Sequence, residues 1–366
     1  MSDNSYGLAN AGEAVEITAP DLAYQPPRPK DYAPKIGLIG CGGITSYHLD
    51  AYKALNQRVV AFCDTDQKRA TERRDTYNPA GTIHTDYRDV LSQDDIEVVD
   101  VATHPETRIP ILEAAIDAGK HILSQKPFVV DIETGKRLCD RADEKGVKIA
   151  VNQNGRWAPH FSYIMRAIEA GMIGEVGSID CTMQWDHTWT RGTDFEQIHH
   201  LMLYDFGIHW FDIIVAMMGN RPPKSVYASV EHLGYQQMKP PFLASVVIDF
   251  DGAQARLNLN GHVIHGQEDR TIVAGSTGTL RAFGPELNNQ QVALWSEAGH
   301  AKPQLDGCWF ESGFEGTMGE LLCAIEEDRK PFNNARDNLD SLALCFAAMR
   351  SANEGVAIHL ENETSL

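Results

Sequence analysis

The sequence predicts an α/β protein in two parts, a doubly wound parallel sheet followed by an α/β domain with a large, mostly antiparallel open sheet. Between residues 35 and 151, short apolar runs alternate with helical stretches over short connections, which is typical of a parallel sheet covered by helices on both faces. Later segments alternate apolar with polar residues between long loops, as strands with one solvated or partner-covered face do. A length of 366 residues with 43% apolar residues suits two globular domains.

The expected elements of the first part follow one another in regular order. Strands are expected at 36–39, 59–63, 98–102, 121–124 and 148–151, with helices up to about 56 and over 70–77, 109–118 and 132–145. In the second part we expect strands at 178–185, 225–231, 244–249, 255–260, 271–274 and 292–295, and helices at 161–170, 314–327 and 338–353. Residues 1–34, rich in proline around 26–34, are expected to form an extended arm on the domain or on a partner, or to be mobile. The predicted domains are therefore 1–34, 35–155 and 156–366.

Composition excludes several classes of protein. The formal net charge of −19 disfavours binding to nucleic acid or to an anionic membrane, because both need a basic surface. No run of about 18 apolar residues is present, and the first thirty residues lack the pattern of a secretion signal. The seven cysteines are scattered and never spaced as Cys-x-x-Cys, so disulfides and zinc are disfavoured and a cytoplasmic location is expected.

A glycine-rich turn follows the first strand. Gly40 permits a tight turn, and Gly42 and Gly43 let the backbone approach a pyrophosphate at the start of the next helix. Thr45 occupies the position where a third glycine is usual, and such a turn alone is also compatible with a plain strand–helix connection. Asp64 ends the second strand 24 residues after Gly40, where a carboxylate can bind the adenosine ribose and repel the extra phosphate of NADP. NAD is therefore the expected cofactor of a Rossmann domain.

Two further segments carry candidate catalytic groups. Asp205, His209 and Asp212 are spaced i, i+4 and i+7, so on one helix they would share a face suited to proton transfer. The same spacing also occurs on an ordinary solvated helix face. Lys126 follows the strand at 121–124 and should point towards the nicotinamide, where an ammonium can stabilise a developing alkoxide.

Together these features resemble the Gfo/Idh/MocA family, the oxidoreductases related to glucose–fructose oxidoreductase and inositol dehydrogenase. The resemblance extends from Lys35 over nearly the whole chain. Its marks are Gly40-Cys41-Gly42-Gly43-Ile44, Ala118-Gly119-Lys120-His121 leading into Lys126-Pro127, the segment with Asp205, Gly207, His209 and Asp212, and Gly319-Glu320-Leu321. It departs from the family pattern at Thr45 and at Gln125, which stands where the family usually has glutamate.

The resemblance implies a role for each matching residue. Lys126, Asp205 and His209 correspond to the family's catalytic set. The cofactor would be bound by Gly40, Gly42, Gly43, Ile44, Asp64, Thr103, Pro105, Gln125, Lys126 and Asn154. It also implies that the open sheet forms the interface of a homo-oligomer, a dimer or a tetramer.

The resemblance implies that the substrate is a sugar, a sugar derivative or a cyclic polyol. Aromatic rings can pack on the C–H face of a pyranose while basic groups bind its hydroxyls, although the tryptophans of the second domain could equally be core or interface residues. The candidate substrate-binding residues are Arg156, Trp157, Trp185, His187 and Tyr204. No metal is expected, since His187, His199 and His200 lack a compact ligand pattern. The leading hypothesis is NAD-dependent hydride transfer at a secondary alcohol.

Two alternatives use the same scaffold. A glycoside hydrolase could oxidise a sugar transiently, eliminate the substituent, add water and reduce again, with Tyr204 or His187 supplying the extra acid or base. A non-enzymatic sensor could bind NAD and a partner protein, although this chain retains Lys126 and His209.

Overall fold

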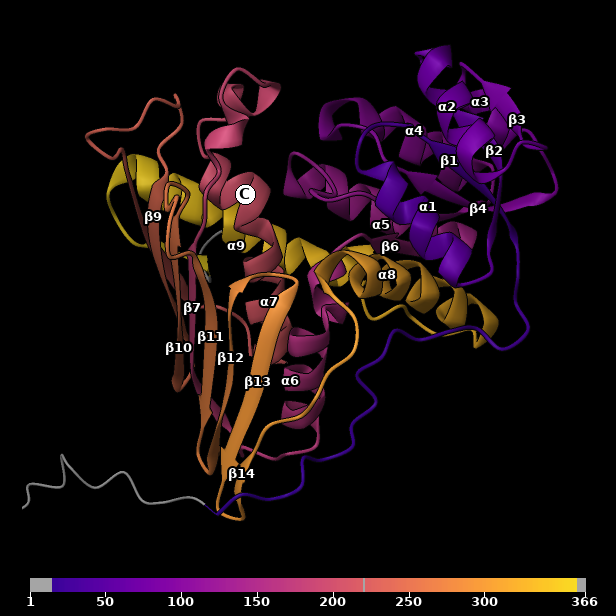
Figure 1. Ribbon diagram of the computed structural model, residues 1–366. Helices are drawn as coiled ribbons and strands as arrows, with labels where there is room; N and C mark the ends of the chain where they lie inside the picture. Colours follow the sequence, from indigo (N-terminus) through magenta and orange to yellow (C-terminus); the bar gives the residue numbers. More distant parts are fainter. Residues whose placement is uncertain (1–14, 220, 361–366) are drawn as a thin grey trace, which may run out of the picture.

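The computed structural model describes residues 15–219 and 221–360 and contains two sheets joined by helices that contact both (Figure 1). This confirms the predicted fold class, a parallel sheet followed by a mostly antiparallel one. No helix within the described ranges is long and apolar enough to cross a membrane.

The first sheet has six parallel strands in the order β3-β2-β1-β4-β5-β6, the crossover arrangement of a Rossmann domain. Its strands are β1 (Lys35–Ile39), β2 (Arg58–Cys63), β3 (Thr82–His84), β4 (Ile96–Val101), β5 (His121–Ser124) and β6 (Ile149–Val151). Its helices are α1 (Thr45–Ala54), α2 (Gln67–Tyr77), α3 (Tyr87–Leu91), α4 (Pro105–Asp117) and α5 (Ile132–Lys145). The sequence prediction missed β3 and α3, which are too short to show a periodic pattern.

The second sheet has nine strands in the order β14-β13-β12-β11-β7-β10-β9-β8-β15, and only the β7–β10 pair is parallel. Its strands are β7 (Val176–Gln184), β8 (Ser225–Glu231), β9 (Leu243–Phe250), β10 (Ala253–Asn260), β11 (Glu268–Gly275), β12 (Gly278–Glu286), β13 (Asn289–Ser296), β14 (Gly299–Ala301) and β15 (Ile358–His359). Helices α6 (Pro159–Glu169), α7 (Ile208–Met218) and α9 (Ala335–Glu354) cover one face (Figure 1). The missed strand β12 contains glycines and a proline that hide its alternation.

Helix α8 (Trp309–Glu326) returns from the second half of the chain to cover the Rossmann sheet, which the division at residue 155 does not anticipate. Its apolar side chains Phe314, Met318 and Leu321 join the core formed by β1 and α1. A β-carbon at Gly316 would lie 2.0 Å from the ring of Trp157, so only glycine admits that indole. The Rossmann core is therefore completed by residues more than 150 positions beyond its last strand.

The described part of the N-terminal arm lies along its own chain, as Figure 1 shows from β14 to α8. Near β14, Ile17 donates its backbone N–H to the carbonyl of His300. At the other end the carboxylate of Glu326 accepts the backbone N–H groups of Lys30, Asp31 and Tyr32 at 2.7 to 2.8 Å. Residues 15–34 thus tie the second sheet to the helix that completes the first.

Asp269 on β11 is a buried carboxyl whose two oxygens have no hydrogen-bond partner among the described residues. Burial, with smaller contributions from Glu286 and Glu268, raises its pKa to about 8. The unfolded carboxyl ionises near pH 4, so unfolding releases a proton between about pH 4 and pH 8 and stability falls as the pH rises through that window.

We predict that Asp269→Asn removes this dependence of the free energy of unfolding on pH. The variant should match the unsubstituted protein at pH 4 and exceed its free energy of unfolding by on the order of 5 kcal/mol at pH 8. Urea unfolding at several pH values measures the difference. A constant difference across the range would show that the pKa of Asp269 is the same in the folded and unfolded protein.

Candidate active site

The glycine turn between β1 and α1 is open where a dinucleotide would lie. Gly40 has a φ of +94°, and a β-carbon there would lie 2.8 Å from the backbone of Ala102. At Gly42 and Gly43 a β-carbon would meet nothing within 4 Å, so both face open space. Ile44 follows them as the N-cap residue of α1. The turn thus combines a backbone that only glycine adopts easily with room for a pyrophosphate at a helix N-terminus.

The side chains around the turn explain why Thr45 stands where a third glycine is usual. The hydroxyl of Thr45 donates to the carbonyl of Gly42 at 2.7 Å and accepts from Nε of Arg73 at 3.1 Å. Arg73, on α2, also donates to the Gly42 carbonyl at 3.0 Å. Asp64 accepts the backbone N–H of Cys41 at 2.8 Å, which places its carboxylate beside the turn. The sequence prediction missed Arg73, because an exposed helix pattern hides its long-range contact.

Buried polar atoms gather beyond the carboxyl ends of β4 and β6. Thr103 Oγ1, Asn152 Oδ1 and Gln153 Oε1 have no hydrogen-bond partner within the described part of the chain. Buried polar atoms are normally satisfied, so such a group at the edge of a wound sheet fits a bound dinucleotide. Asn154, predicted for this role, instead directs Nδ2 towards the carbonyl of Trp309 on α8, at 3.4 Å.

The loops that carry Thr103 and Lys126 are held by one buried arginine. Arg108 on α4 donates to the backbone carbonyls of Thr103, Gln125 and Pro127. Arg108 is 1% exposed and forms no ion pair with a carboxylate among the described residues, so its hydrogen bonds hold the two loops. Pro105, predicted to line the cofactor, is the first residue of the same helix. Arg108 was missed by the sequence prediction because nothing local marks an arginine that will be buried.

Lys126 and Asp205 form a close pair across the two domains. Lys126 Nζ donates to the backbone carbonyl of Asp205 at 2.8 Å and to its Oδ1 at 3.0 Å. Both side chains are less than one fifth exposed. Lys126 comes from the loop after β5 and Asp205 from a π-helical turn, Met202–Phe206, that precedes α7. The pair therefore joins the second domain to the carboxyl edge of the Rossmann sheet.

His209 is partly buried and lies close enough to this pair to feel the charge of Lys126. Burial, followed by the positive charge of Lys126, holds the pKa of His209 well below its usual value. Its Nδ1 is buried and has no partner among the described residues, while its ring contacts that of Trp309, with centroids 5.5 Å apart. His209 is therefore a neutral imidazole at neutral pH, able to accept a proton beside an ammonium.

The predicted common face of Asp205, His209 and Asp212 is wrong for Asp212. The π-helical turn ends at Phe206 and α7 begins at Ile208, so the segment is not one regular helix. Asp212 instead faces inward and binds Arg156 through both oxygens, at 2.6 and 2.8 Å. Asn338 and Ser341 on α9 also donate to Oδ1 of Asp212. Asp212 thus belongs to a buried structural network and Asp205 to the site.

Arg156 and Trp157 lie in the interior and not at an open substrate surface. Nε and both terminal nitrogens of Arg156 donate to Asp212 or to the carbonyl of Phe332. Burial opposes the charge of Arg156, but Asp212 outweighs it and raises the pKa of the guanidinium. Trp157 is 2% exposed and packs into the glycine face of α8. Each guanidinium nitrogen of Arg156 already has an acceptor and Trp157 is buried, so the structure places neither side chain at an open substrate surface, contrary to the prediction.

Aromatic side chains line the approach from the surface to Asp205. His187 stacks on Phe206 with ring centroids 3.9 Å apart, and Trp185 contacts His187 edge-on at 5.4 Å. Both ring nitrogens of His187 are buried without a partner within the described chain, and burial lowers its pKa to about 4. Trp189, 6.3 Å from His187, is 54% exposed. The rings run from the buried site to solvent.

Tyr204 precedes Asp205 in the π-helical turn. Burial, and then the charge of Glu106, raises the pKa of its phenol to about 12, so the hydroxyl stays protonated at neutral pH. Its ring stacks with Phe346 of α9, with centroids 6.4 Å apart.

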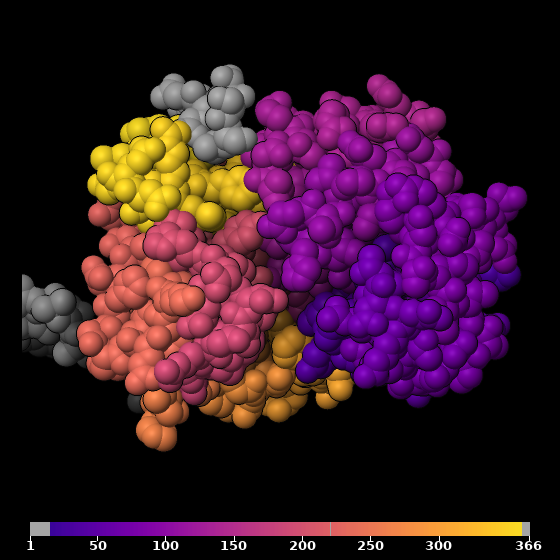
Figure 2. Space-filling view, turned by 90° about the horizontal axis from the view of Figure 1, so that it is seen from above, coloured from indigo at the N-terminus to yellow at the C-terminus, as the bar shows by residue number. Residues whose placement is uncertain are grey.

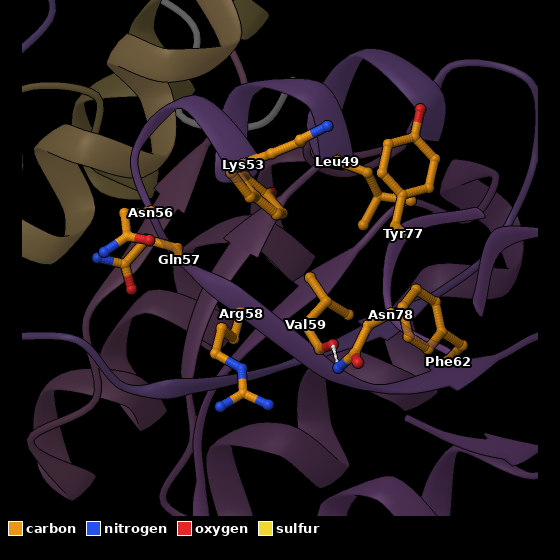
Figure 3. Close-up of a pocket in the computed structure, with 10 residues that line it drawn as sticks. Leu49, Lys53, Asn56, Gln57, Arg58, Val59, Phe62, Tyr77 and Asn78 are labelled. Atoms are coloured by element: carbon orange, nitrogen blue, oxygen red, sulfur yellow. Dashed lines mark hydrogen bonds between the residues drawn. The ribbon is translucent and has the colours of Figure 1, made fainter. Parts of the chain in front are cut away.

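Figure 2 shows the N-terminal half, in indigo to magenta, meeting the pink segment near residue 200 along a furrow. A separate hollow lies between α1, β2 and the end of α2 (Figure 3). Lys53, Arg58 and Asn78 are among its lining residues, and it includes none of Lys126, Asp205 and His209. The described residues contain no group of three or more acidic, histidine or cysteine side chains that could hold a metal ion.

Comparison with known proteins identifies the family. Residues 34–153 match the model of the oxidoreductase family with an NAD-binding Rossmann fold, and residues 161–281 match the GFO/IDH/MocA C-terminal domain. The chain belongs to the Gfo/Idh/MocA family. Its first part is accordingly an NAD-binding Rossmann domain, and the protein is an oxidoreductase of this family.

Named relatives of this Gfo/Idh/MocA protein span nearly its whole length. D-apiose dehydrogenase of Paraburkholderia graminis is 25% identical, with 90% of each chain covered. Inositol 2-dehydrogenase of Rhizobium meliloti is 26% identical over 87% of this chain and 97% of the relative. The structure of scyllo-inositol dehydrogenase from Lactobacillus casei, solved with NAD(H) and scyllo-inositol, has the same fold, with a TM-score of 0.77 at 19% identity over 90% of this chain and all of the other.

Proposed function

We propose that this protein transfers a hydride between NAD and a secondary alcohol of a sugar, a sugar derivative or a cyclic polyol. The observation that carries the proposal is the Lys126–Asp205 pair with the neutral imidazole of His209 beside it, at the carboxyl edge of an NAD-binding sheet. The relatives named as dehydrogenases of apiose and inositol support the substrate class.

Each catalytic group has a separate task in this mechanism. His209 accepts the proton of the substrate hydroxyl as the C–H bond breaks, because its depressed pKa keeps it neutral. Lys126 donates a hydrogen bond to the same oxygen and stabilises the developing alkoxide. Asp205 holds Lys126 in place and accepts a hydrogen bond from a neighbouring hydroxyl. The chemistry that bound NAD would supply here is that of a hydride acceptor.

The cofactor would lie along the carboxyl edge of the Rossmann sheet. Gly40, Gly42 and Gly43 would receive the pyrophosphate, and Asp64 would bind the adenosine ribose. Thr103 would meet the nicotinamide half, where its hydroxyl has no protein partner in the described chain.

A panel of sugars, inositols and sugar acids, followed by NADH absorbance, tests the proposed reaction. Oxidation of at least one member with one NADH formed for each alcohol lost is expected. Release of an aryl alcohol from a glycoside with NAD required but not consumed would establish the hydrolase instead. Failure of every substrate, in a protein that still binds NAD, would overturn the proposal.

Trp189 is expected to bind the substrate without taking part in the reaction. An exposed indole beside His187 offers its face to the C–H surface of a sugar ring, a contact of about 0.5–1.5 kcal/mol. Trp189→Ala should therefore raise KM by about 3- to 10-fold at an unchanged kcat. Trp189→Phe, which keeps a ring, should give an intermediate KM, and an unchanged KM in both variants would remove Trp189 from the site.

We also infer a cytoplasmic homo-oligomer. All seven cysteines are free thiols, as in proteins of a reducing compartment. The face of the nine-stranded sheet opposite the helices exposes Tyr227 and Phe283 to 45% and 40%, a surface that a second copy could cover. Light scattering that gives the mass of a monomer would overturn the oligomer.

A further inference from the structure

A chain of buried polar groups lies beneath the glycine turn and is not used in the mechanism above. It begins at Asp100 on β4, which is fully buried. Asp100 Oδ2 lies 2.7 Å from Nδ1 of His48 and accepts the hydroxyl of Tyr52 at 2.5 Å. His48 and Tyr52 are both on α1, the helix that begins at the dinucleotide turn. One end of the chain is thus anchored in the helix that would face the pyrophosphate.

Nε2, on the opposite edge of the His48 ring from Nδ1, lies near two side-chain amides. Nε2 of His48 lies 3.3 Å from Nε2 of Gln125 and 3.0 Å from Nδ2 of Asn152. The second end of the Gln125 amide, Oε1, accepts the backbone N–H of Lys126 at 2.7 Å. The chain of contacts therefore runs from Asp100 through His48 and Gln125 to the backbone of Lys126.

These contacts determine which atom donates in each pair. The backbone N–H of Lys126 can only donate, so the oxygen of the Gln125 amide must face it and the NH₂ group must face His48. The NH₂ group donates, so Nε2 of His48 must accept. Nδ1 then carries the ring proton and donates it to Asp100, whose carboxylate also accepts from Tyr52. In each pair from Lys126 to Asp100, the group nearer Lys126 donates and the group nearer Asp100 accepts.

We propose that His48 is a positioning residue for Lys126, acting through the amide of Gln125. Asp100 fixes the ring of His48, His48 fixes the orientation of the Gln125 amide, and the amide holds the backbone of Lys126. Arg108 also binds the backbone carbonyls of Gln125 and Pro127. The backbone around Lys126 is therefore held both by Arg108 and by the amide of Gln125. The chain also links α1 to the lysine loop, which joins the cofactor helix to the catalytic group.

Two substitutions of His48 separate this role from simple core packing. A glutamine side chain can place its oxygen near the position of Nε2 and keep the acceptor for Gln125, but it loses the bond to Asp100. An asparagine side chain keeps a donor near Nδ1 for Asp100 but offers nothing to Gln125. If His48 acts on Lys126, His48→Gln should keep kcat within about threefold, while His48→Asn should lower kcat by about tenfold or more.

The KM for NAD should stay within about twofold in both variants, because neither changes the glycine turn or Asp64. A merely structural role predicts the reverse order, since His48→Asn would leave Asp100 paired. Equal kcat in both variants, or a higher kcat in His48→Asn, would overturn the proposal.

A spectroscopic measurement on the unsubstituted protein covers the case in which a variant does not fold. The ¹⁵N shifts of His48, assigned by their absence in either variant that folds or otherwise by contacts to the ring of Tyr52, should show a neutral ring protonated on Nδ1. A ring protonated on Nε2, or on both nitrogens, would overturn the proposal. The kinetic test rests on the proposed dehydrogenase function, whereas the tautomer is measured without substrate, so the two failures are distinguishable.

Discussion

Lys126→Met is expected to lower kcat for oxidation of the alcohol by about 10²- to 10³-fold, the usual effect of removing a donor that stabilises a developing oxyanion. The methionine side chain keeps the length and most of the packing of lysine but has no proton to donate. Initial rates under saturating NAD measure the loss. Lys53→Met is the matched control: Lys53 lines the separate hollow beside α1, so this variant should leave kcat unchanged (Figure 3).

The same substitution is expected to shift the pH profile of the residual activity. His209 acts as a base only when neutral, so a low pKa keeps the enzyme active to low pH. The charge of Lys126 contributes to that low pKa, after burial, and its removal raises the pKa of His209. The acid limb of kcat should therefore move to higher pH in Lys126→Met. An acid limb that stays in place would show that another group takes the proton.

Asp212→Ala is expected to destabilise the protein by about 3–5 kcal/mol, because it leaves the guanidinium of Arg156 buried without its carboxylate. Urea unfolding followed by fluorescence measures the change. Asp117→Asn, which breaks an ion pair between two partly exposed side chains, Asp117 and Arg141, is the control and should leave the midpoint of the transition unchanged.

Activity measured on the same variant distinguishes the two readings of the Asp205–His209–Asp212 spacing. In the structure Asp212 belongs to the interior, so the folded fraction of Asp212→Ala should keep most of its kcat. A variant of normal stability with strongly reduced kcat would instead place Asp212 in the catalytic set, as its spacing on a regular helix would predict.

Much of the site could be predicted because its marks are local. A glycine turn between a buried strand and a helix, an acidic residue at the end of the next strand and a lysine after a later strand each lie within a few residues. The topology of a wound sheet then brings the carboxyl ends of its strands to one edge. Lys126 was proposed on this basis, whereas Asp205 and His209 were proposed from their spacing and from the family resemblance. The structure pairs Lys126 with Asp205 and places His209 within reach of the charge of Lys126.

The residues that the prediction missed, or placed wrongly, have partners far away in the sequence. Arg108 contacts loops on two neighbouring strands, and Arg73 reaches back to the glycine turn from α2. Arg156, expected at the substrate, has its donors taken by Asp212 and Phe332. A buried arginine and a solvated one look the same in a sequence, because the difference depends on which groups lie opposite.

The sequence by itself determined the two kinds of sheet and the dinucleotide turn, since hydrophobic period and turn residues act within a short stretch of chain. Only the tertiary structure decided that α8 completes the first domain and that Asp205 lies in a π-helical turn while Asp212 lies in the following helix α7. It also decided that His48 lies between Asp100 and Gln125. These arrangements depend on packing and hydrogen bonding between distant segments, and no local pattern encodes which distant group becomes the partner.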